Sequence, residues 1–591
     1  MNTNFLLTKI SFVVCFLLPA FIAPAQNTPA AIQVNQVGFY PNAPKVAVVT
    51  VEATSPDFFV IGWQSKDTVL RGKLSEKIQS ANSSIITRIA DFSSLKKTGT
   101  YQVAIPGSHS SYPFVIKEKV LAEVAIAVLK SYYFQRVSMP LDEEYAGKWK
   151  RPAGQPDTAV IIHPSAVSEK RPAGTVISTP GGWYDAGDYN KYIVNSGITM
   201  ATMFAAYEDY EVYYRQLKTG IPGSNNRLPD ILDELLVNLR WMLTMQDPAD
   251  GGVYNKCTNA SFDGMVMPGV TTAPRYLVQK GTAATLDFAA VTAQAARIFS
   301  QFKSQLPGFS DSCLQAATSA WRWAEANPAM QYDQQAINKK YQPQISTGGY
   351  GDRNYDDEFF LASCELFVTT KDTRYLSLLK QQLNRPIRIP SWNQVALPGL
   401  YTLLRLKPNM DAETSALLKD VQKRLLAFAD TLANGVNGNA FRTVMGRLSS
   451  DFNWGSNSNA ANQGVLLINA FLLSNNKKYM DAALSNIDYI LGRNATGYCF
   501  VTGTGTRSPM NPHHRPSVSD SITEPVPGFV VGGPNPGQQD KCTYAFKEPE
   551  TSYTDVACSY ASNEIAINWN APLVYLLNAF EALQSKVGYS K

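Results

Sequence analysis

The sequence predicts a multidomain protein in which a small all-β sandwich is followed by a much larger all-α domain. Two observations carry this prediction. Short β-branched runs separated by turn residues fill residues 26–117, and apolar stripes at helical spacing recur through residues 118–591. With 591 residues, 45% hydrophobic and 17% charged, the chain is long enough and apolar enough to bury a core in each domain.

Residues 1–25 have the pattern of a secretory signal peptide. Lys9 precedes an apolar run from Ile10 to Ala23, and the small residue Ala25 lies just before the expected cleavage near Gln26. Cys15 lies inside the apolar run, where a lipid anchor would need it after the run. We therefore expect a secreted or periplasmic protein, or one held at the cell surface. No later stretch approaches the roughly 18 apolar residues of a membrane span.

Charge and cysteine usage exclude several classes of partner. The formal net charge of +5 is small for the length, and no Lys/Arg run is interleaved with aromatic residues, so we expect no nucleic acid. The six cysteines beyond Cys15 are scattered without a CxxC pair, which gives a zinc cluster or a disulfide scaffold little support. Only Cys542 and Cys558 flank one short segment, and they are the one candidate disulfide.

The first domain is predicted as an immunoglobulin-like sandwich. Its apolar runs recur about every ten residues between Pro, Gly, Asn and Ser, as in a small antiparallel sandwich. No aromatic platform for a sugar stands out in it, so we expect a structural role. The runs are Ile32–Val34, Val46–Val51, Phe58–Trp63, Ile85–Ile89, Tyr101–Ile105 and Phe114–Ile116.

The second domain is predicted as a closed toroid of helical hairpins. So many helices joined by long Gly- and Pro-rich loops do not suit a four-helix bundle, and long loops in a compact domain are usually functional. The helical stripes begin with Leu121–Tyr132 and continue at Ile198–Tyr207, Ile231–Leu243, Leu286–Ile298, Phe359–Phe367, Leu417–Leu432, Val465–Leu473, Met480–Leu491 and Ile565–Leu583.

Two loops carry acidic residues suited to hydrolysis. In the loop from Gly181 to Asn190, Asp185 and Asp188 stand three residues apart and can hold one water and deprotonate it. The alternative is an Asp that caps the next helix. Further on, Glu564 opens an apolar helix flanked by aromatic residues, which would keep it protonated as a general acid. The alternative there is a favourable partner for the helix dipole.

A third loop runs from Asn511 to Arg515 and holds an adjacent histidine pair beside arginine. Because the protein has four histidines in all, such a pair is unusual as core filling. Imidazole and guanidinium donors can bind sugar hydroxyls, whereas the alternatives are a surface loop or a metal site that lacks further ligands.

Taken together, these loops resemble glycoside hydrolase family 9, a cellulase family with an (α/α)6 barrel, over nearly all of the mature chain. The resemblance implies that the leading sandwich is the immunoglobulin-like domain of many members, packed on the barrel through a fixed interface. Its motifs here are Asp185–Asp188, Pro512–Arg515 and the C-terminal set Tyr553, Asp555, Tyr560, Asn563 and Glu564. Weaker similarities are Arg151–Gly154, Met245–Gln246, Gly251–Tyr254, Ala283–Ala290, Gly348–Asp352 and Trp454–Ser458.

The resemblance also implies residue roles. Glu564 is then the general acid, Asp188 the general base, and Asp185 helps to position the water. Inversion in one displacement needs the two carboxyl groups about 6.5–9.5 Å apart. His513 and Arg515 would bind the sugar at the cleavage subsite, while Asp555 would support the acid loop.

Aromatic residues near the motifs are candidates for stacking on pyranose rings, with core packing as the alternative: Trp183, Tyr184, Trp454 and Tyr560. Trp569 stands where many members have Tyr, so we expect an altered sugar contact there. Ligands of the zinc site in some relatives are absent around Cys257 and His163, and we predict no metal in that position. Structural calcium is common in the family, but its ligands are not placed.

The prediction is therefore an endo-acting β-1,4-glucanase that requires no cofactor, acts on a β-glucan polysaccharide or oligosaccharide and is a monomer. One alternative is an exo-acting cellodextrinase or glucosaminidase of the same family, distinguished by loops that block the cleft. Another is a non-catalytic secreted glycan-binding protein, against which the retention of all three acidic residues argues. The absence of a recognisable cellulose-binding module favours soluble or branched glucans over crystalline cellulose.

Overall fold

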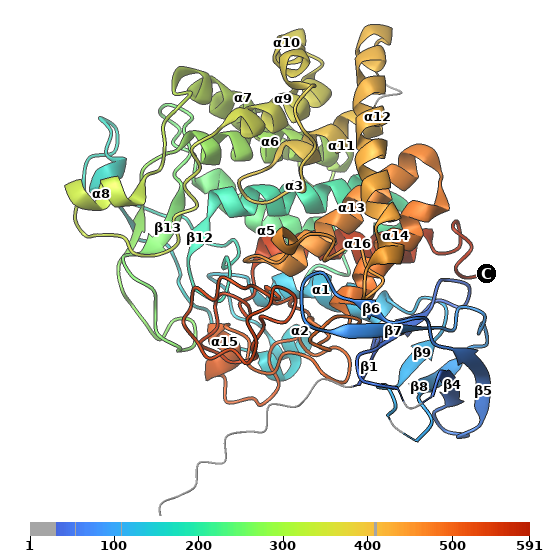
Figure 1. The fold of residues 1–591 in the computed structure, drawn as a ribbon. Coiled ribbons are helices and arrows are strands. Elements are labelled where there is room, and N and C mark those ends of the chain that lie inside the picture. The colour runs from blue at the N-terminus through green and yellow to red at the C-terminus, as the bar shows by residue number, and fades with distance from the viewer. Residues whose placement is uncertain (1–30, 54, 108, 407–409) are drawn as a thin grey trace, which may run out of the picture.

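A computed structural model describes residues 31–53, 55–107, 109–406 and 410–591, which form a β-sandwich packed on a helical domain (Figure 1). The predicted signal peptide, residues 1–25, lies outside the described residues. Within the described part of the chain, no helix is long and apolar enough to cross a membrane.

The N-terminal domain is the predicted immunoglobulin-like sandwich. Its two sheets have the strand orders β1-β3-β7-β6 and β2-β9-β8-β4-β5. Edge-to-face contacts of Phe39 with Phe92 and with Phe114, each at 5.3 Å between ring centroids, lie in the core between them. The strands are β1 (Ile32–Gln33), β2 (Gly38–Phe39), β3 (Val46–Val49), β4 (Asp57–Gly62), β5 (Thr68–Lys73), β6 (Ile78–Gln79), β7 (Ile86–Asp91), β8 (Gly99–Ala104) and β9 (Phe114–Ile116).

Each predicted run of this domain overlaps a strand. Alternation did not reveal β2, β5 and β6, because two of them are only two residues long and β5 is largely exposed.

The second domain is the predicted (α/α)6 barrel. Helix α16 packs on α3 and α13, α3 on α6, α6 on α9 and α9 on α11, while α7, α10 and α14 lie outside this ring against α6, α9 and α13. The helices are α1 (Ala122–Phe134), α3 (Ile193–Asp209), α5 (Asp230–Thr244), α6 (Thr282–Phe299), α7 (Phe309–Ala326), α9 (Asp356–Thr370), α10 (Thr373–Gln382), α11 (Ala396–Leu406), α12 (Ala412–Asn434), α13 (Ser456–Ser474), α14 (Lys477–Ile490) and α16 (Ile567–Leu583); shorter ones are α2 (Glu143–Ala146), α4 (Glu211–Tyr214), α8 (Gln334–Lys340) and α15 (Arg515–Ser519).

A small sheet that periodicity did not predict lies in the loops of this domain. Its order is β11-β10-β14-β13-β12. The strands are short and partly polar: β10 (Val160–Ile162), β11 (Val176–Ile177), β12 (Lys191–Tyr192), β13 (Lys256–Asn259) and β14 (Arg275–Leu277). Because β12 directly follows Asp188 and Asn190, this sheet holds one of the predicted catalytic loops.

The predicted fixed interface between the two domains is present. Tyr40 donates to Glu581 Oε1 at 2.7 Å, and Asn35 Nδ2 donates to Asp488 Oδ1 at 2.8 Å. Figure 1 shows the blue sandwich beside α14 and α16, which carry these two acceptors. Val48 and Ile89 of the sandwich form an apolar cluster with Phe441 of the barrel. The interface thus combines apolar packing with hydrogen bonds, so the two domains are not joined by a free linker alone.

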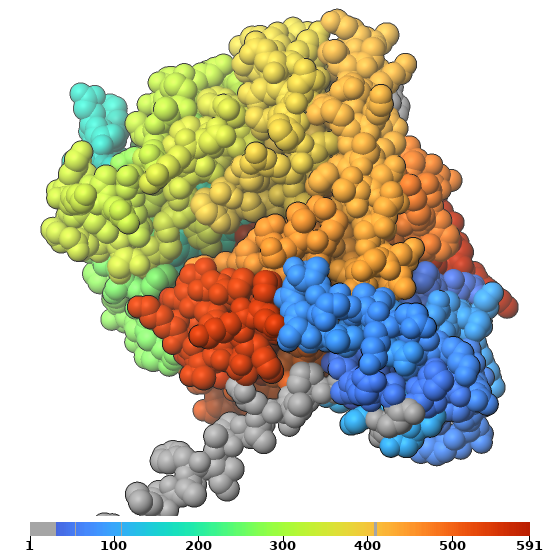
Figure 2. All heavy atoms as spheres, viewed as in Figure 1, coloured from blue at the N-terminus to red at the C-terminus, as the bar shows by residue number. Residues whose placement is uncertain are grey.

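The sandwich also contacts a C-terminal loop that precedes Glu564. Ser83 Oγ donates to Glu550, and the Ser84 backbone N–H donates to Glu548 Oε1 at 2.7 Å. Figure 2 shows the red surface of this loop directly against the blue surface of the sandwich. The sandwich therefore supports a segment of the site described next.

Candidate active site

A cleft of about 730 Å³ opens between the first turn of α16 and the long loops, including those that lead into α3 and α13. It brings together residues from all three predicted motif loops. Its lining includes Asp185, Asp188, Tyr192, Phe262, Thr347, Gly348, Tyr350, Trp392, Trp454, His513, Arg515, Tyr560, Glu564, Ala566, Asn568 and Trp569.

Asp188 lies in a loop whose shape is fixed by close packing. A Cβ on Gly187 would lie 2.1 Å from the carbonyl oxygen of His513, so the third residue of the Asp185–Asp188 motif must be glycine. Asp188 Oδ2 accepts hydrogen bonds from Asn190 Nδ2 at 2.5 Å and from the Tyr192 hydroxyl at 3.2 Å. Helix α3 begins at Ile193 without a side-chain cap, so Asp188 is not a helix cap.

Asp185 is buried and held at both oxygens. Asn195 Nδ2 donates to Oδ1 at 2.5 Å and the Tyr350 hydroxyl donates to Oδ2 at 2.7 Å. Burial, followed by the nearby charge of Asp188, raises the pKa of Asp185 to about 8. The protonated form of the Asp185 carboxyl is therefore favoured at neutral pH.

Glu564 lies directly against the aspartate loop. The backbone N–H of Ile567 donates to the Asp185 carbonyl at 2.9 Å, and Ala186 and Ala566 form a β-bridge. Burial, then the charge of Asp188, raises the pKa of Glu564 well above its usual range, while Arg515 opposes the shift. Helix α16 begins three residues later, at Ile567, so Glu564 precedes the helix and the dipole alternative does not explain it.

The histidine–arginine loop borders the same two segments. His513 Nδ1 lies 2.7 Å from the Ala557 carbonyl, which can only accept, so Nδ1 carries the hydrogen and Nε2 is an acceptor in the neutral ring. Burial lowers the pKa of His513, which favours that neutral form. Arg515 Nη1 donates to the Gly187 carbonyl at 2.8 Å. His514 is buried against Phe529 and does not line the cleft.

Asp555 lies behind the cleft and joins the histidine loop to the acid loop. Its carboxylate accepts the backbone N–H groups of Met510 at 2.8 Å and Asn511 at 2.9 Å, and Asn563 Nδ2 at 3.1 Å. Burial raises the pKa of Asp555. Its contacts fit the predicted supporting role and give it no place against a substrate.

Three of the predicted aromatic residues line the cleft. Trp454 is 44% exposed, and its ring lies 5.5 Å from that of Tyr560 with a tilt of 32°. Trp569 packs against Gly455, where a Cβ would lie 2.6 Å from the indole nitrogen. Trp454 and Tyr560 therefore form a two-ring platform at the mouth of the cleft.

The stacking role predicted for Trp183 and Tyr184 is wrong. Trp183 is 0% and Tyr184 1% exposed, and neither ring lines the cleft. Trp183 packs on Tyr132 at 4.6 Å and donates to Glu234 Oε1 at 2.9 Å. Trp183 therefore points into the barrel core, and Tyr184 packs with Val137 and Tyr189 in a separate apolar cluster, whereas Asp185 and Asp188 face the cleft.

Several residues of the cleft were not predicted from the sequence. Tyr350 lies within the Gly348–Asp352 motif, which was noted only as a similarity, and its contact with Asp185 gives it a role. Tyr192, Phe262, Trp392 and Asn568 also line the cleft. Trp392 packs edge-on against Tyr350 at 5.4 Å, and no local pattern marks it.

A disulfide closes the loop that directly precedes Tyr560. Cys542 and Cys558, the candidate pair, are bonded. The Tyr560 hydroxyl donates to the Gln539 carbonyl at 3.1 Å, and Ser559 Oγ donates to Asp540 Oδ2 at 2.8 Å. The crosslink thus constrains the segment that supplies both Tyr560 and the Ala557 carbonyl that orients His513.

The region predicted to lack zinc is filled by other contacts. Cys257 Sγ lies between Thr179 and Asp157, at 3.7 Å from an oxygen of each, while His163 contacts Ser165 and the Pro343 carbonyl. Across the described ranges, no three His, Cys, Asp or Glu side chains are arranged to hold a metal ion.

Comparison with known proteins places this geometry in a family. A family model described as glycosyl hydrolase family 9 matches residues 122–577, and one described as a cellulase N-terminal Ig-like domain matches residues 27–110. The chain is 46% identical to a xyloglucan-specific endo-β-1,4-glucanase of Bacteroides ovatus, over 94% of each sequence. It is 33% identical to endoglucanase D of Acetivibrio thermocellus, over 93% of this chain and 83% of that protein.

Solved structures give the same result. A Bacteroides ovatus family 9 protein superposes with a TM-score of 0.89 at 45% identity, covering 94% of this chain and 99% of that one. An endoglucanase of Alicyclobacillus acidocaldarius superposes with a TM-score of 0.83 at 30% identity, covering 94% of this chain and 100% of that one.

Proposed function

The chain belongs to glycosyl hydrolase family 9, and from that premise we propose that it is an endo-acting β-1,4-glucanase that hydrolyses xyloglucan with inversion at the anomeric carbon. The observation that carries the proposal is the convergence of Asp188, Asp185 and Glu564 in one aromatic-lined cleft. One acidic group whose pKa is raised, facing carboxylates on a neighbouring loop, is the arrangement that glycoside hydrolysis needs.

Glu564 acts as the general acid. Its raised pKa favours the protonated carboxyl, which can donate its proton to the glycosidic oxygen as the bond from that oxygen to the anomeric carbon breaks. The leaving chain departs as a neutral alcohol, and Glu564 is left as a carboxylate.

Asp188 acts as the general base on the opposite face of the sugar. It takes one proton from a water whose oxygen forms the new bond to the anomeric carbon, so a single displacement inverts the centre and no covalent sugar intermediate forms. Asp188 then releases its proton to solvent and Glu564 takes up a proton from solvent, which restores the starting state. Asp185, held by Asn195 and Tyr350, orients the water beside Asp188.

His513, Arg515 and the aromatic residues bind the chain. The free Nε2 of His513 accepts from a sugar hydroxyl, and Arg515 lies between the Gly187 carbonyl and the ring of Phe262. The Trp454–Tyr560 platform suits the apolar face of a pyranose ring. The xyloglucan preference rests on the relative that is 46% identical along 94% of both sequences.

A structural calcium ion is proposed at the start of α9, away from the reacting groups. Both carboxylate oxygens of Asp287 and of Glu358 are buried without a hydrogen-bond partner, and Asp352 and Asp357 influence their charge. Hard oxygen ligands of this kind suit calcium. The ion would be held by the unpartnered oxygens of Asp287 and Glu358, with water as its remaining ligands. Secretion, proposed from the N-terminal pattern, would provide the calcium-containing surroundings.

Product analysis tests the proposal. Xyloglucan, carboxymethyl cellulose, barley β-glucan and cellohexaose are each digested while viscosity and reducing ends are followed, and the anomer first formed is identified by proton NMR. A fast viscosity drop on xyloglucan with α-configured new ends is expected. Slow viscosity loss with one small product would instead indicate exo action. New ends in the β configuration would contradict inversion.

A further inference from the structure

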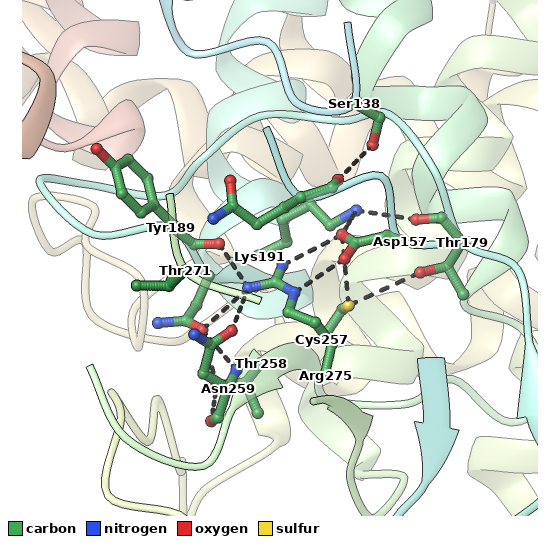
Figure 3. A network of polar contacts seen from close by, with 12 residues as sticks. Ser138, Asp157, Thr179, Tyr189, Lys191, Cys257, Thr258, Asn259, Thr271 and Arg275 are labelled. Carbon is green, nitrogen blue, oxygen red and sulfur yellow. Dashed lines mark hydrogen bonds and ion pairs between the residues drawn. The ribbon is translucent and has the colours of Figure 1, made fainter. Parts of the chain in front are cut away.

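The network beneath the aspartate loop carries an inference about residues outside the cleft. Figure 3 shows the guanidinium of Arg275 between Asp157 on one side and the carbonyl of Tyr189 on the other, with Asn259 below it. Asp157, Lys191 and Arg275 are all buried and come from three separate segments. None of them lines the cleft.

Arg275 is fully satisfied by this arrangement. Its Nε and Nη2 donate to the two oxygens of Asp157 at 2.9 and 3.1 Å. Nη1 donates to the Tyr189 carbonyl and to Asn259 Oδ1, each at 2.8 Å, and reaches Asn190 Oδ1 at 3.4 Å. One planar side chain thus holds the end of the aspartate loop to β13.

The network decides which way the Asn190 amide faces. Asn190 Oδ1 accepts from the Asn259 backbone N–H at 2.9 Å and from Thr258 Oγ1 at 3.0 Å, in addition to Arg275. An amide turned the other way would place its NH₂ group against these donors. Nδ2 is therefore directed at Asp188 Oδ2, to which it donates at 2.5 Å.

A second branch leads from Arg275 toward Arg515. Asn259, which accepts from Arg275, donates through Nδ2 to both oxygens of Asp263, at 3.1 and 3.0 Å. The Asp263 carbonyl accepts from Arg515 Nε at 3.0 Å. The same buried guanidinium is thus connected to the proposed base and to a proposed sugar contact.

We propose that Arg275 is a positioning residue for hydrolysis, which acts through Asn190 to hold Asp188 in the orientation that accepts a proton from water. The inference rests on the proposed function of Asp188. Asp157 keeps a second cation, Lys191 Nζ at 2.7 Å, when Arg275 is changed. Substitution at Arg275 therefore leaves no unpaired buried carboxylate, and folding can be preserved.

Three variants test the proposal on the full-length enzyme with xyloglucan. Arg275→Lys keeps the charge but lacks the planar fork, so it cannot hold Asp157 and the Tyr189–Asn190 segment together. Asn190→Ala removes the amide without touching the ion pairs. We expect both to lower kcat by about 10- to 100-fold with little change in KM, since displacement of a catalytic group by about 1 Å can cost that much. Thr179→Val, on the far side of Asp157 in Figure 3, is the matched control and should keep wild-type kinetics.

A double-mutant cycle identifies the route. If Arg275 acts through Asn190, the Arg275→Lys/Asn190→Ala variant should be within about twofold of Asn190→Ala alone. Losses that multiply, or an Asn190→Ala enzyme with wild-type kcat, would overturn the proposal. Asn190→Ala decides the matter if Arg275→Lys does not fold, and circular dichroism melting identifies that case.

The design separates this proposal from the function on which it rests. A wild-type enzyme without activity on any β-glucan, or an Asp188→Asn variant with wild-type rate, would refute the assignment of the base. An active wild type, an inactive Asp188→Asn variant and unchanged Asn190→Ala kinetics would refute the positioning role alone.

Discussion

The Tyr350 hydroxyl donates a 2.7 Å hydrogen bond to Asp185 Oδ2, on the opposite side of the carboxylate from Asn195. Tyr350 also lines the cleft and packs against Tyr192, the hydroxyl donor to Asp188. The two neighbouring carboxylates therefore each receive one tyrosine and one asparagine donor, yet burial and the charge of Asp188 raise the pKa of Asp185 to about 8.

This relationship predicts the alkaline side of the pH profile. Activity should fall near pH 8, where the Asp185 carboxyl ionises and places its negative charge next to Asp188. Tyr350→Phe removes a donor that stabilises the charged form, so the pKa of Asp185 rises further and the alkaline limb of kcat/KM moves to higher pH. We expect kcat at neutral pH to fall about fivefold, the value of one hydrogen bond to an uncharged group.

The exposed Tyr341 provides the control, since Tyr341→Phe lies outside the cleft and should leave both limbs in place. An unmoved alkaline limb in Tyr350→Phe would assign that limb to Glu564, whose pKa is raised as well.

Substrates with different leaving groups distinguish the roles of Glu564 as general acid and Asp188 as general base. Glu564→Gln should lower kcat on xyloglucan by about 10²- to 10⁴-fold, because general acid catalysis is lost. It should retain most activity on an aryl cellooligosaccharide whose phenol leaves without protonation. Asp188→Asn should be slow on both substrates, and azide should restore turnover by replacing the water.

Glu548→Gln is the matched control, because Glu548 lies on a neighbouring loop and contacts Ser84 instead of the cleft. Equal losses on both substrates in Glu564→Gln would contradict its assignment as the acid.

Much of this site could be predicted from sequence because its residues occur in short motifs. The Asp185–Asp188 loop, the histidine–arginine loop and the Glu564 segment each place chemistry within a few consecutive residues. The sequence predicted the one-sided α5 as well as the almost wholly buried α3 and α6, whereas α7, α10 and α11 were missed.

What could not be predicted depends on long-range packing. Trp183 and Trp454 both stand beside a motif, but only the fold turns the first into the core and the second into the cleft. Likewise, no spacing connects Asp157, Lys191 and Arg275, and the polar strands that bring them together lack an apolar alternation.

The disulfide predicts a selective effect of reduction. Opening the bond between Cys542 and Cys558, which are 16 residues apart, releases a loop whose closure contributes about 3 kcal/mol. The Ala557 carbonyl lies on that loop and Tyr560 follows it by two residues, so KM for xyloglucan should rise while the barrel stays folded. Reduced enzyme is assayed beside thiol labelling; the free cysteines of the described chain, Cys257, Cys313, Cys364 and Cys499, are buried and should not react.

The Cys542→Ser variant should reproduce the defect and show no further response to reductant. Unchanged KM in that variant would contradict the role of the crosslink.

Calcium should stabilise the wild-type protein. Binding at 100 times the dissociation constant adds about 2.7 kcal/mol, so Tm should rise with added calcium and fall with a chelator. Glu358→Gln and Asp287→Asn should each abolish this response, because their unpartnered oxygens supply the proposed ligands. Asp372→Asn, at the exposed cap of α10, should respond as wild type does. A wild-type Tm that does not change with added calcium would contradict the proposed calcium site.

The interface predicts that the two domains unfold together. Asn35 of the sandwich donates to Asp488 of α14, whose other oxygen accepts from Arg493 Nη1 at 2.6 Å, and all three side chains are buried. Asn35→Ala leaves a buried acceptor without one donor, which should lower the free energy of unfolding by about 1–3 kcal/mol. Because the sandwich also contacts the loop before Glu564, melting and loss of activity should shift by the same amount in a single transition, as measured by calorimetry and by residual activity.

Lys77→Ala breaks only an exposed ion pair with Glu52 and should change neither the melting temperature nor the activity. A separate early transition of the sandwich, with the barrel still active, would show that the interface does not couple the two domains.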